Sequence, residues 1–467
     1  MMWLLDIFTW VFVVYNLAIN VGYLALNLMA IVSLVYKNQE NLLNKLPQSY
    51  SEFEYPISIL VPAFNEEATI VASIKSMLQL EYSNYEIVVI NDGSKDNTLA
   101  QLQSAFGLVR TNQSKPDLLA TQTVRGLYRS QHYPNLFVID KMNGGKADSL
   151  NAGINFSHHP LFCAVDADSI LERTGLQRLV KPFMRNPDMV VTGGTIRVAN
   201  GCNVSQGNLT HIGLPTNFLA LLQVVEYLRA FLFGRLGWSR LNAILIVSGA
   251  FGLFKRDKII EVGGYKTKTI GEDMELIVRL HRVLRAKGEP CPVEFVADSV
   301  CWTEVPEDIK TLRNQRVRWQ RGLCESLQAN KGLLFAPTGG AAGWIAFPFM
   351  LIFEAIGPLL EVVGYISMLV AVVMDYISWP SFWIIFASTV SIGALLSTMA
   401  LALEEFSFHT YPKLSHLLVL WLVGIVDSFG YRQINTYWRV MGLYKWATQK
   451  EAQWGNMTRK ASWATKT

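Results

Sequence analysis

The chain has 467 residues, which is too many for one ordinary compact domain. Hydrophobic residues make up 51% of it and charged residues only 17%, a balance that is typical of a protein with both soluble and membrane segments. The formal net charge of +4 is too small to suggest nucleic-acid binding on its own, so we expect no nucleic-acid partner.

The five cysteines form no CxxC pair and no Cys/His cluster with zinc spacing. We interpret them as free thiols in a reducing compartment, buried as small hydrophobic side chains. They are Cys163, Cys202, Cys291, Cys301 and Cys324.

The first segment, residues 1–36, is predicted to be an N-terminal transmembrane helix. The 30 positions between Asp6 and Lys37 carry no charge, and a helix needs roughly 20 apolar residues to cross a bilayer. Lys37 and Lys45 follow this run, and basic residues favour the cytosolic side. A cleaved signal peptide fits less well, because it has a basic segment before a shorter apolar run.

Residues 50–330 have the composition of a soluble domain in which short β-rich runs alternate with amphipathic runs. Strands are predicted over 57–62, 85–91, 135–140, 161–166 and 189–198, and helices over 67–80, 98–106, 146–156 and 174–184. This alternation predicts an α/β fold with a mostly parallel, Rossmann-like sheet. Ligands of such sheets bind at the carboxyl ends of the strands.

Residues 331–434 are predicted to form transmembrane or interfacial helices, with spanning candidates at about 346–374, 381–403 and 414–434. The first candidate contains Glu354 and Glu361, and the last contains Asp427 and Arg432; such charges usually face a protein interior or a wet cavity. The alternative, that these segments are amphipathic helices at the interface, stays open.

Residues 435–467 are predicted to be a basic cytosolic tail. From Arg432 to Thr467 there are seven basic residues and one acidic residue, Glu451. Three crossings after a cytosolic domain would put this tail outside the cell. We therefore expect one segment within 340–434 to be interfacial or re-entrant.

Polar motifs follow the predicted strands at their carboxyl ends. Glu66 lies just after the first strand, and Asp92 follows the second strand, ahead of Gly93 and Ser94. A carboxylate at such a position can accept hydrogen bonds from a nucleoside. An Asp-Gly-Ser sequence is also a common turn. Lys146 follows Asn143-Gly144-Gly145 at the start of a helix, which favours an anion site over an ordinary helix start.

Two acidic motifs are candidates for metal binding and proton transfer. Asp166 and Asp168 follow a buried strand and point to the same side of the chain. A hard cation, Mg²⁺ or Mn²⁺, shared with phosphate oxygens would relieve their repulsion, and a solvated acidic turn is the alternative. Glu272 and Asp273 precede a helical run; Glu272 suits a helix-dipole partner, and Asp273 suits a general base for an acceptor hydroxyl.

The motif Gln315-Arg316-Val317-Arg318-Trp319 lies in a basic helical run. Arginine binds diphosphate through bidentate hydrogen bonds, and tryptophan offers a flat apolar face to a sugar ring. A basic helix lying on anionic lipid is the alternative reading.

Together, Asp92, Asp166-Ala167-Asp168, Glu272-Asp273 and Gln315-x-x-Arg318-Trp319 resemble the processive family 2 glycosyltransferases, which include the cellulose, chitin, hyaluronan and poly-N-acetylglucosamine synthases. The resemblance covers roughly residues 55 to 330 and extends loosely to the flanking helices. It implies a GT-A fold, an inverting mechanism, and transfer from UDP-N-acetylglucosamine or UDP-glucose to a growing polysaccharide.

The resemblance also implies roles for single residues. Glu66 and Asp92, with Asp166 nearby, would contact uridine, and Asp168 would hold Mg²⁺ or Mn²⁺. Lys146 and Arg318 would face the diphosphate, and Gln315 and Arg316 of the same motif would also bind substrate. Asp273 would be the base, with Glu272 beside it in the catalytic pair. Trp319 would form the base of the acceptor site, and Ser248-Gly249 resembles the acceptor loop of the family. The chain departs from the family at Gly271, where Thr is usual, which puts the detailed acceptor geometry in question.

The expected location is the inner or plasma membrane, with several crossings and a cytoplasmic catalytic domain. The expected partners are the UDP-sugar, a glycan acceptor and the lipid bilayer; an accessory export or regulatory subunit and a homo-oligomer stay open. One rival function is non-processive transfer to a lipid or lipid-linked acceptor. The other is a membrane transporter or receptor with a nucleotide-binding regulatory domain.

Overall fold

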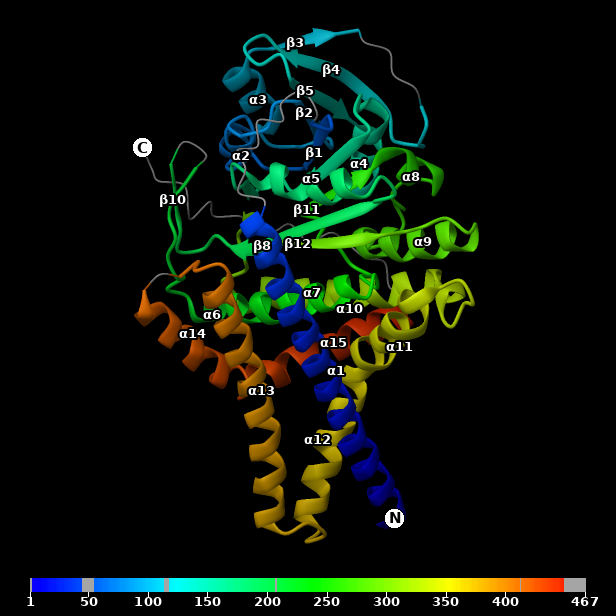
Figure 1. Cartoon of the computed structure of the whole chain (residues 1–467), viewed down its shortest axis with the longest axis vertical. Coiled ribbons are helices and arrows are strands. Elements are labelled where there is room, and N and C mark those ends of the chain that lie inside the picture. The colour runs from blue at the N-terminus through cyan, green and yellow to red at the C-terminus, as the bar shows by residue number, and fades with distance from the viewer. Residues whose placement is uncertain (1, 44–53, 113–116, 206–207, 412, 449–467) are drawn as a thin grey trace.

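The computed structural model describes residues 2–43, 54–112, 117–205, 208–411 and 413–448. A mixed α/β domain forms the upper part of the molecule in Figure 1, and long helices extend below it. Lys45 and most of the predicted basic tail, residues 449–467, lie outside the described residues.

The domain is built on a ten-stranded sheet with the order β3-β4-β5-β2-β1-β6-β11-β8-β12-β7. Its central strands β5, β2, β1 and β6 are parallel, while β11 runs antiparallel between β6 and β8. A separate hairpin joins β9 and β10. The strands are β1 Ile57–Ala63, β2 Tyr85–Asn91, β3 Leu108–Thr111, β4 Val124–Ser130, β5 Leu136–Lys141, β6 Leu161–Val165, β7 Ile170–Leu171, β8 Val191–Val198, β9 Asn203–Ser205, β10 Asn208–His211, β11 Phe251–Lys255 and β12 Val293–Thr303.

Helices cover the sheet because the central strands are apolar on both faces. All five residues of β6 are buried, as expected for a strand in the middle of a parallel sheet. The covering helices are α2 Ile70–Met77, α3 Thr98–Phe106, α4 Lys146–Phe156, α5 Gly175–Arg185, α8 Arg256–Glu261, α9 Glu272–Ala286 and α10 Ile309–Ala329. The predicted α/β architecture is confirmed, whereas the hairpin β3–β4 and the strands β11 and β12 were not predicted.

A layer of helices lies beneath the sheet. Helix α6 (Phe218–Glu226) continues through the π-helix η1 (Tyr227–Phe233) into α7 (Gly234–Arg240). Figure 1 shows α6, α7, α10 and α15 (Tyr431–Ala447) running across the molecule below the strands. The floor of the domain is therefore helical and faces the apolar part of the molecule.

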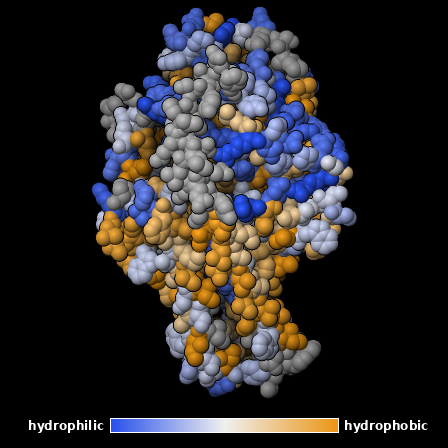
Figure 2. Space-filling model, viewed as in Figure 1, coloured by the Kyte–Doolittle hydropathy of each residue, from blue (hydrophilic) through white to orange (hydrophobic). Residues whose placement is uncertain are grey.

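Within the described residues, three helical segments are long and apolar enough to cross a membrane: Trp10–Leu34 in α1 (Met2–Leu43), the run Ala342–Val373, and α13 (Trp379–Ser407). The second runs from η3 (Ala342–Ala346) through α11 (Phe347–Phe349) and η4 (Met350–Ile356) to α12 (Gly357–Val373). Figure 2 shows apolar surface concentrated over this lower part of the molecule and polar surface over the domain.

The segment predicted to span at 414–434 is broken. Helices α14 (Leu414–Val426) and α15 (Tyr431–Ala447) are bent by 58° relative to each other, and Gly430 between them has a φ of 92° that favours glycine. Figure 1 shows both helices lying across the molecule. This geometry fits the expectation that one segment in this region is interfacial or re-entrant.

The charged residues among the apolar helices face one another inside the protein. Arg439 on α15 donates to Glu354 at 2.7 Å, and Thr436 donates to Glu361 at 2.7 Å. Asp427 accepts from Arg229 at 2.9 Å. Such pairing is the usual way in which charges in an apolar environment are tolerated.

Candidate active site

The site forms where β6 ends, at the carboxyl edge of the parallel strands. Asp166 and Asp168 directly follow β6; the Asp166 side chain is 28% exposed, and Asp168 is only 5% exposed. The ammonium of Lys146, the first residue of α4, lies 2.5 Å from Oδ1 of Asp166. The predicted anion site and the predicted acidic turn are therefore one place in the fold.

Lys146 also connects this edge to the predicted acceptor loop and base. Its ammonium donates to the carbonyl of Gly249 at 3.1 Å, and the Gly249 amide donates to Oδ2 of Asp273 at 3.2 Å. A Cβ at position 249 would lie 3.1 Å from the Lys146 nitrogen, so a larger residue would crowd this junction. Residues predicted from four distant stretches thus converge.

Burial and charge act in opposite directions on these groups. Burial lowers the pKa of Lys146, but Asp166, Glu272 and Asp273 outweigh it and raise the pKa above its ordinary value. Burial and the neighbouring Asp273 raise the pKa of Glu272 to about 7, although Lys146 and Arg318 act to lower it. The site is a largely buried set of opposite charges that shift one another's pKa values.

Asp92 lies behind the glycine-rich loop and organises it. Its carboxylate accepts from the Lys141 ammonium and from the amides of Gly144 and Gly145 at 3.0 and 2.8 Å. Asn143 donates to the same carboxylate at 3.1 Å. In the described residues Asp92 therefore holds the loop that begins α4, and the predicted uridine contact stays a prediction.

Glu66 lies on the loop after β1, which is tied to the loop after β2. The Glu66 amide donates to Thr98 at 2.9 Å, and its carboxylate accepts from Thr69 at 2.9 Å. The side chain of Asn65, with a φ of 55°, accepts from the Lys95 amide at 2.8 Å. The two loops form one rigid wall beside the glycine-rich loop.

The α10 motif lies on the other side of the site. Arg318 acts electrostatically on Glu272, and the Trp319 ring is 37% exposed, with its centroid 5.9 Å from that of Phe231. Arg316 is instead buried; it donates to Glu226 at 2.7 Å, and its guanidinium lies 4.4 Å from the Trp319 ring centroid. Gln315 is partly buried beside it. Arg316 thus anchors α10 to α6 and supports the tryptophan.

Arg235 on α7 is a site residue that the sequence analysis did not identify. It is 7% exposed, and its guanidinium lies 4.6 Å from the Phe231 ring centroid. Burial lowers its pKa to about 10, while Asp273 and Tyr227 act in the opposite direction. A lone arginine within an apolar helical run was the available signal, because such a charge needs a partner.

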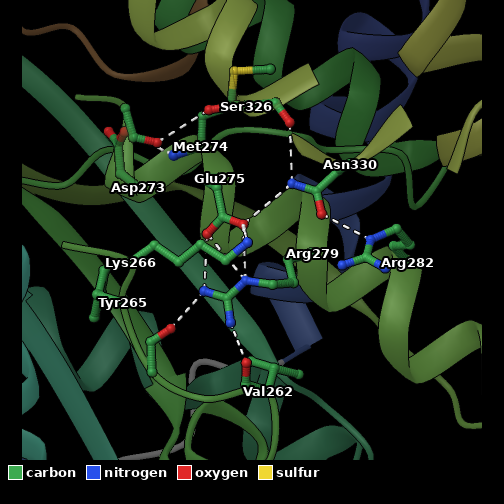
Figure 3. Close-up of polar contacts among 12 residues, drawn as sticks. Val262, Tyr265, Lys266, Asp273, Met274, Glu275, Arg279, Arg282, Ser326 and Asn330 are labelled. Carbon is green, nitrogen blue, oxygen red and sulfur yellow. Dashed lines mark hydrogen bonds and ion pairs between the residues drawn. The ribbon is translucent and has the colours of Figure 1, made fainter. Parts of the chain in front are cut away.

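A buried ion-pair cluster holds the helix that carries Asp273 (Figure 3). Glu275 is fully buried and accepts from Arg279 at 2.9 Å, and Arg279 in turn donates to the carbonyls of Val262 and Gly264. The next residue, Tyr265, exchanges two 2.8 Å hydrogen bonds with Asn151 of α4. The helices that present Lys146 and Asp273 are therefore linked through one loop.

Gly271, the departure from the family pattern, has a packing reason. A Cβ there would lie 3.0 Å from backbone atoms of Gly322 on α10. Ser326, one turn later, donates to the Gly271 carbonyl at 3.2 Å. Paired glycines let α10 approach the start of α9 more closely than threonine would allow.

Asp166 and Asp168 are chemically suited to a divalent cation. No group of three or more His, Cys, Asp or Glu side chains placed to hold a metal occurs within residues 2–448 apart from the gaps given above. Two hard carboxylates match Mg²⁺ or Mn²⁺, which usually takes its other ligands from water and substrate phosphates. The donor set thus fits a cation shared with a diphosphate.

Comparison with known proteins establishes the class. Residues 58–263 match the family described as Glycosyl transferase family 2, and residues 162–404, more than half of the chain, match Glycosyl transferase family group 2. The chain belongs to this family and is a glycosyltransferase.

The resemblance to synthases of family 2 is confirmed by curated relatives. Poly-beta-1,6-N-acetyl-D-glucosamine synthase of Staphylococcus aureus (strain COL) is 30% identical over 284 residues, which are 60% of this chain and 57% of the relative. The synthase of the same description from Staphylococcus epidermidis is 29% identical over 266 residues, 57% of this chain and 54% of the relative. The chain thus spans only a little over half the length of these relatives.

A solved structure shares the fold. The mannosyltransferase PcManGT from Pyrobaculum calidifontis superposes with a TM-score of 0.53 at 17% identity, over 93% of this chain and 99% of that chain. The expected fold class, a GT-A domain flanked by apolar helices, is confirmed.

Proposed function

We propose that this glycosyltransferase transfers sugar from a UDP-sugar, either UDP-N-acetylglucosamine or UDP-glucose, to a growing polysaccharide at a membrane. One observation carries the proposal: an ion pair joins Lys146 to Asp166, and hydrogen bonds join Lys146 to Gly249 and Gly249 to Asp273, above a layer of helices. The names of the curated relatives support N-acetylglucosamine as the first sugar to test.

Asp273 is placed to accept the proton of an acceptor hydroxyl. The Gly249 amide holds its Oδ2 at 3.2 Å, and the Met274 amide holds its Oδ1 at 2.8 Å, so the carboxylate has a fixed orientation. Attack by the acceptor on the anomeric carbon from the side opposite the departing nucleotide inverts the configuration. The exposed face of Trp319 offers the acceptor sugar a stacking surface.

Cationic side chains stabilise the departing diphosphate. Lys146 stays protonated because three carboxylates surround it, and Arg318 adds a second positive charge from α10. Asp168, with Asp166 beside it, would hold Mg²⁺ or Mn²⁺, which supplies charge to the leaving group. PcManGT was solved with GDP-Man and Mn²⁺, which supports a nucleotide-sugar and a divalent cation here.

The proposed orientation places the catalytic domain in the cytoplasm and makes α1, the run Ala342–Val373 and α13 the membrane spans. Two of these spans follow the domain, so the chain after α13 is back on the domain's side of the membrane. Helices α14 and α15 then lie at the interface, and the basic tail is cytosolic, in keeping with its charge. This arrangement removes the conflict between a basic tail and three crossings after the domain.

The test is to incubate the purified protein with a panel of UDP-sugars and Mg²⁺ or Mn²⁺, and to measure released UDP and product size. A long polymer from one donor supports the proposal. A single-sugar adduct on a lipid would instead establish the non-processive alternative. Wild-type turnover by Asp273→Asn would rule out this residue as the base.

A further inference from the structure

A second cavity lies at the edge of the domain, apart from the candidate active site. Its volume is about 980 Å³, and its walls come from β7, the start of α5, the hairpin β9–β10 and the segment that joins α13 to α14. Figure 1 shows the upper end of α13, α14 and β10 on the same side of the molecule. It shares no lining residue with the site formed by Lys146, Asp166 and Asp273.

The lining is rich in positive groups. Arg173, Arg178, Arg197 and Lys413 face the cavity against two acidic side chains, Glu172 and Asp298. Two of the arginines are already matched: Arg178 pairs with Glu172 at 3.2 Å, and Arg197 pairs with the buried Glu404 at 2.8 Å. These pairs fix the walls and leave the cavity with an excess of cations.

Histidines supply further hydrogen-bonding groups. His211, His409 and His416 all line the cavity, and burial together with Lys413 and His211 lowers the pKa of His416, so its imidazole is neutral near pH 7. The Nδ1 atom of His416 is buried, and none of the described residues forms a hydrogen bond with it. In the tautomer that carries its proton on Nδ1, this atom would donate to an anion held in the cavity.

The cavity lies where polar surface meets apolar surface. Helix α13, a candidate membrane span, ends at Ser407, just before His409. Helix α14 begins at Leu414 and exposes that residue, Leu418 and Leu422 on its outer face. An amphipathic position of this kind corresponds to the headgroup level of a bilayer.

We propose that this cavity binds a phosphate group, and that its position at the edge of the apolar surface makes an anionic phospholipid headgroup the source. Phosphate matches the lining because guanidinium and ammonium groups donate charge-assisted hydrogen bonds to its oxygens, and a neutral imidazole N–H donates an ordinary one. A soluble phosphate ester carries the same chemistry, so the test must separate these two sources. The proposal does not depend on the sugar donor.

The test uses the purified full-length protein in neutral detergent at constant ionic strength. The probes are short-chain phosphatidylglycerol, the matching diacylglycerol without phosphate, and inorganic phosphate, and the readout is the thermal unfolding midpoint together with the apparent Kd. We expect phosphatidylglycerol to raise the midpoint and diacylglycerol to leave it unchanged. Stabilisation by inorganic phosphate as well would identify a site that also takes soluble phosphate.

The variants Lys413→Gln and Arg173→Gln each remove one cation from the lining. We expect each to weaken phosphatidylglycerol binding about tenfold or more, the usual effect of losing one charge-assisted hydrogen bond. Lys287→Gln is the matched control, because this exposed lysine pairs with Glu261 on another surface. Equal stabilisation by diacylglycerol, no stabilisation by either phosphate probe, or unchanged binding in both lining variants would overturn the proposal.

Discussion

The contact between Gly271 and Gly322 sets how closely α10 approaches the helix that carries Asp273, so Gly322→Ala should impair catalysis from outside the site. An added Cβ would lie 2.9 Å from the Gly271 Cα and 3.0 Å from its nitrogen, whereas ordinary contact begins at 3.4 Å. Both obstacles are backbone atoms. The two helices must therefore separate by roughly 0.5 Å to relieve the overlap.

The magnitude follows from this shift. Overpacking of this kind costs about 1–3 kcal/mol of stability. A displacement of about 1 Å in a catalytic group can lower the rate about a hundredfold. The separation of roughly 0.5 Å expected here should therefore lower the turnover rate about tenfold. Arg318 and Trp319 are carried on α10, one turn before Gly322, so they move with it.

The assay is the initial rate of nucleotide release at saturating donor, with the thermal unfolding midpoint and the nucleotide Kd measured in parallel. Gly332→Ala is the matched control, because its Cβ would meet only the Arg282 side chain at 3.7 Å. We expect a slower rate only for Gly322→Ala. A wild-type rate and midpoint in this variant would refute the claim that the paired glycines position α10.

Three further predictions concern the site itself. Asp168→Asn should abolish transfer together with its dependence on Mg²⁺ or Mn²⁺, and full activity in the presence of a chelator would contradict the metal assignment. Trp319→Ala should slow elongation more than it weakens nucleotide binding, and an unchanged elongation rate would argue against acceptor stacking. Because burial and Asp273 raise the pKa of Glu272 from 4.5 to about 7, the folded protein binds the proton more tightly than the unfolded chain. Stability should therefore fall by up to about 3 kcal/mol as the pH rises from about 4.5 to about 7, and Glu272→Gln should remove this slope; an identical pH dependence of the unfolding midpoint in the variant would show that Glu272 is not the source.

The parts of the fold that the sequence predicted are those with strong local patterns. The apolar run of β6 and the helix of α4 were predicted because their periodicity and flanking glycines are local features. The strand β11 was not, because it is antiparallel and follows an irregular segment after α7, so no strand–helix alternation marks it. The hairpin β3–β4 lies at the edge of the sheet and carries exposed residues, which weaken a strand pattern.

The sequence predicted which residues belong to the candidate site, but not which groups those residues contact. Motif spacing identified Asp92 and Arg316, yet their burial depends on Lys141 and Glu226, which only the folded chain brings near. Arg235 was missed for the same reason, since Asp273, whose charge acts on it, is distant in sequence. Residue type indicates what a side chain can bind, whereas tertiary packing decides which group actually lies beside it.

Helix α10 explains how a soluble-type domain and a set of apolar helices act as one unit. One face carries Arg318 and Trp319 toward the site, while Gln320 on another face donates to the carbonyls of Glu354 and Ala355 at 2.9 and 3.0 Å. The Gln320 oxygen in turn accepts from Arg439 of α15 at 2.8 Å. Gln320 lies next to Trp319 in the chain. Its hydrogen bonds therefore connect the part of α10 that carries the proposed acceptor-stacking residue directly to the apolar helices. We therefore expect a shift of η4 against α15 to displace the part of α10 that carries Trp319.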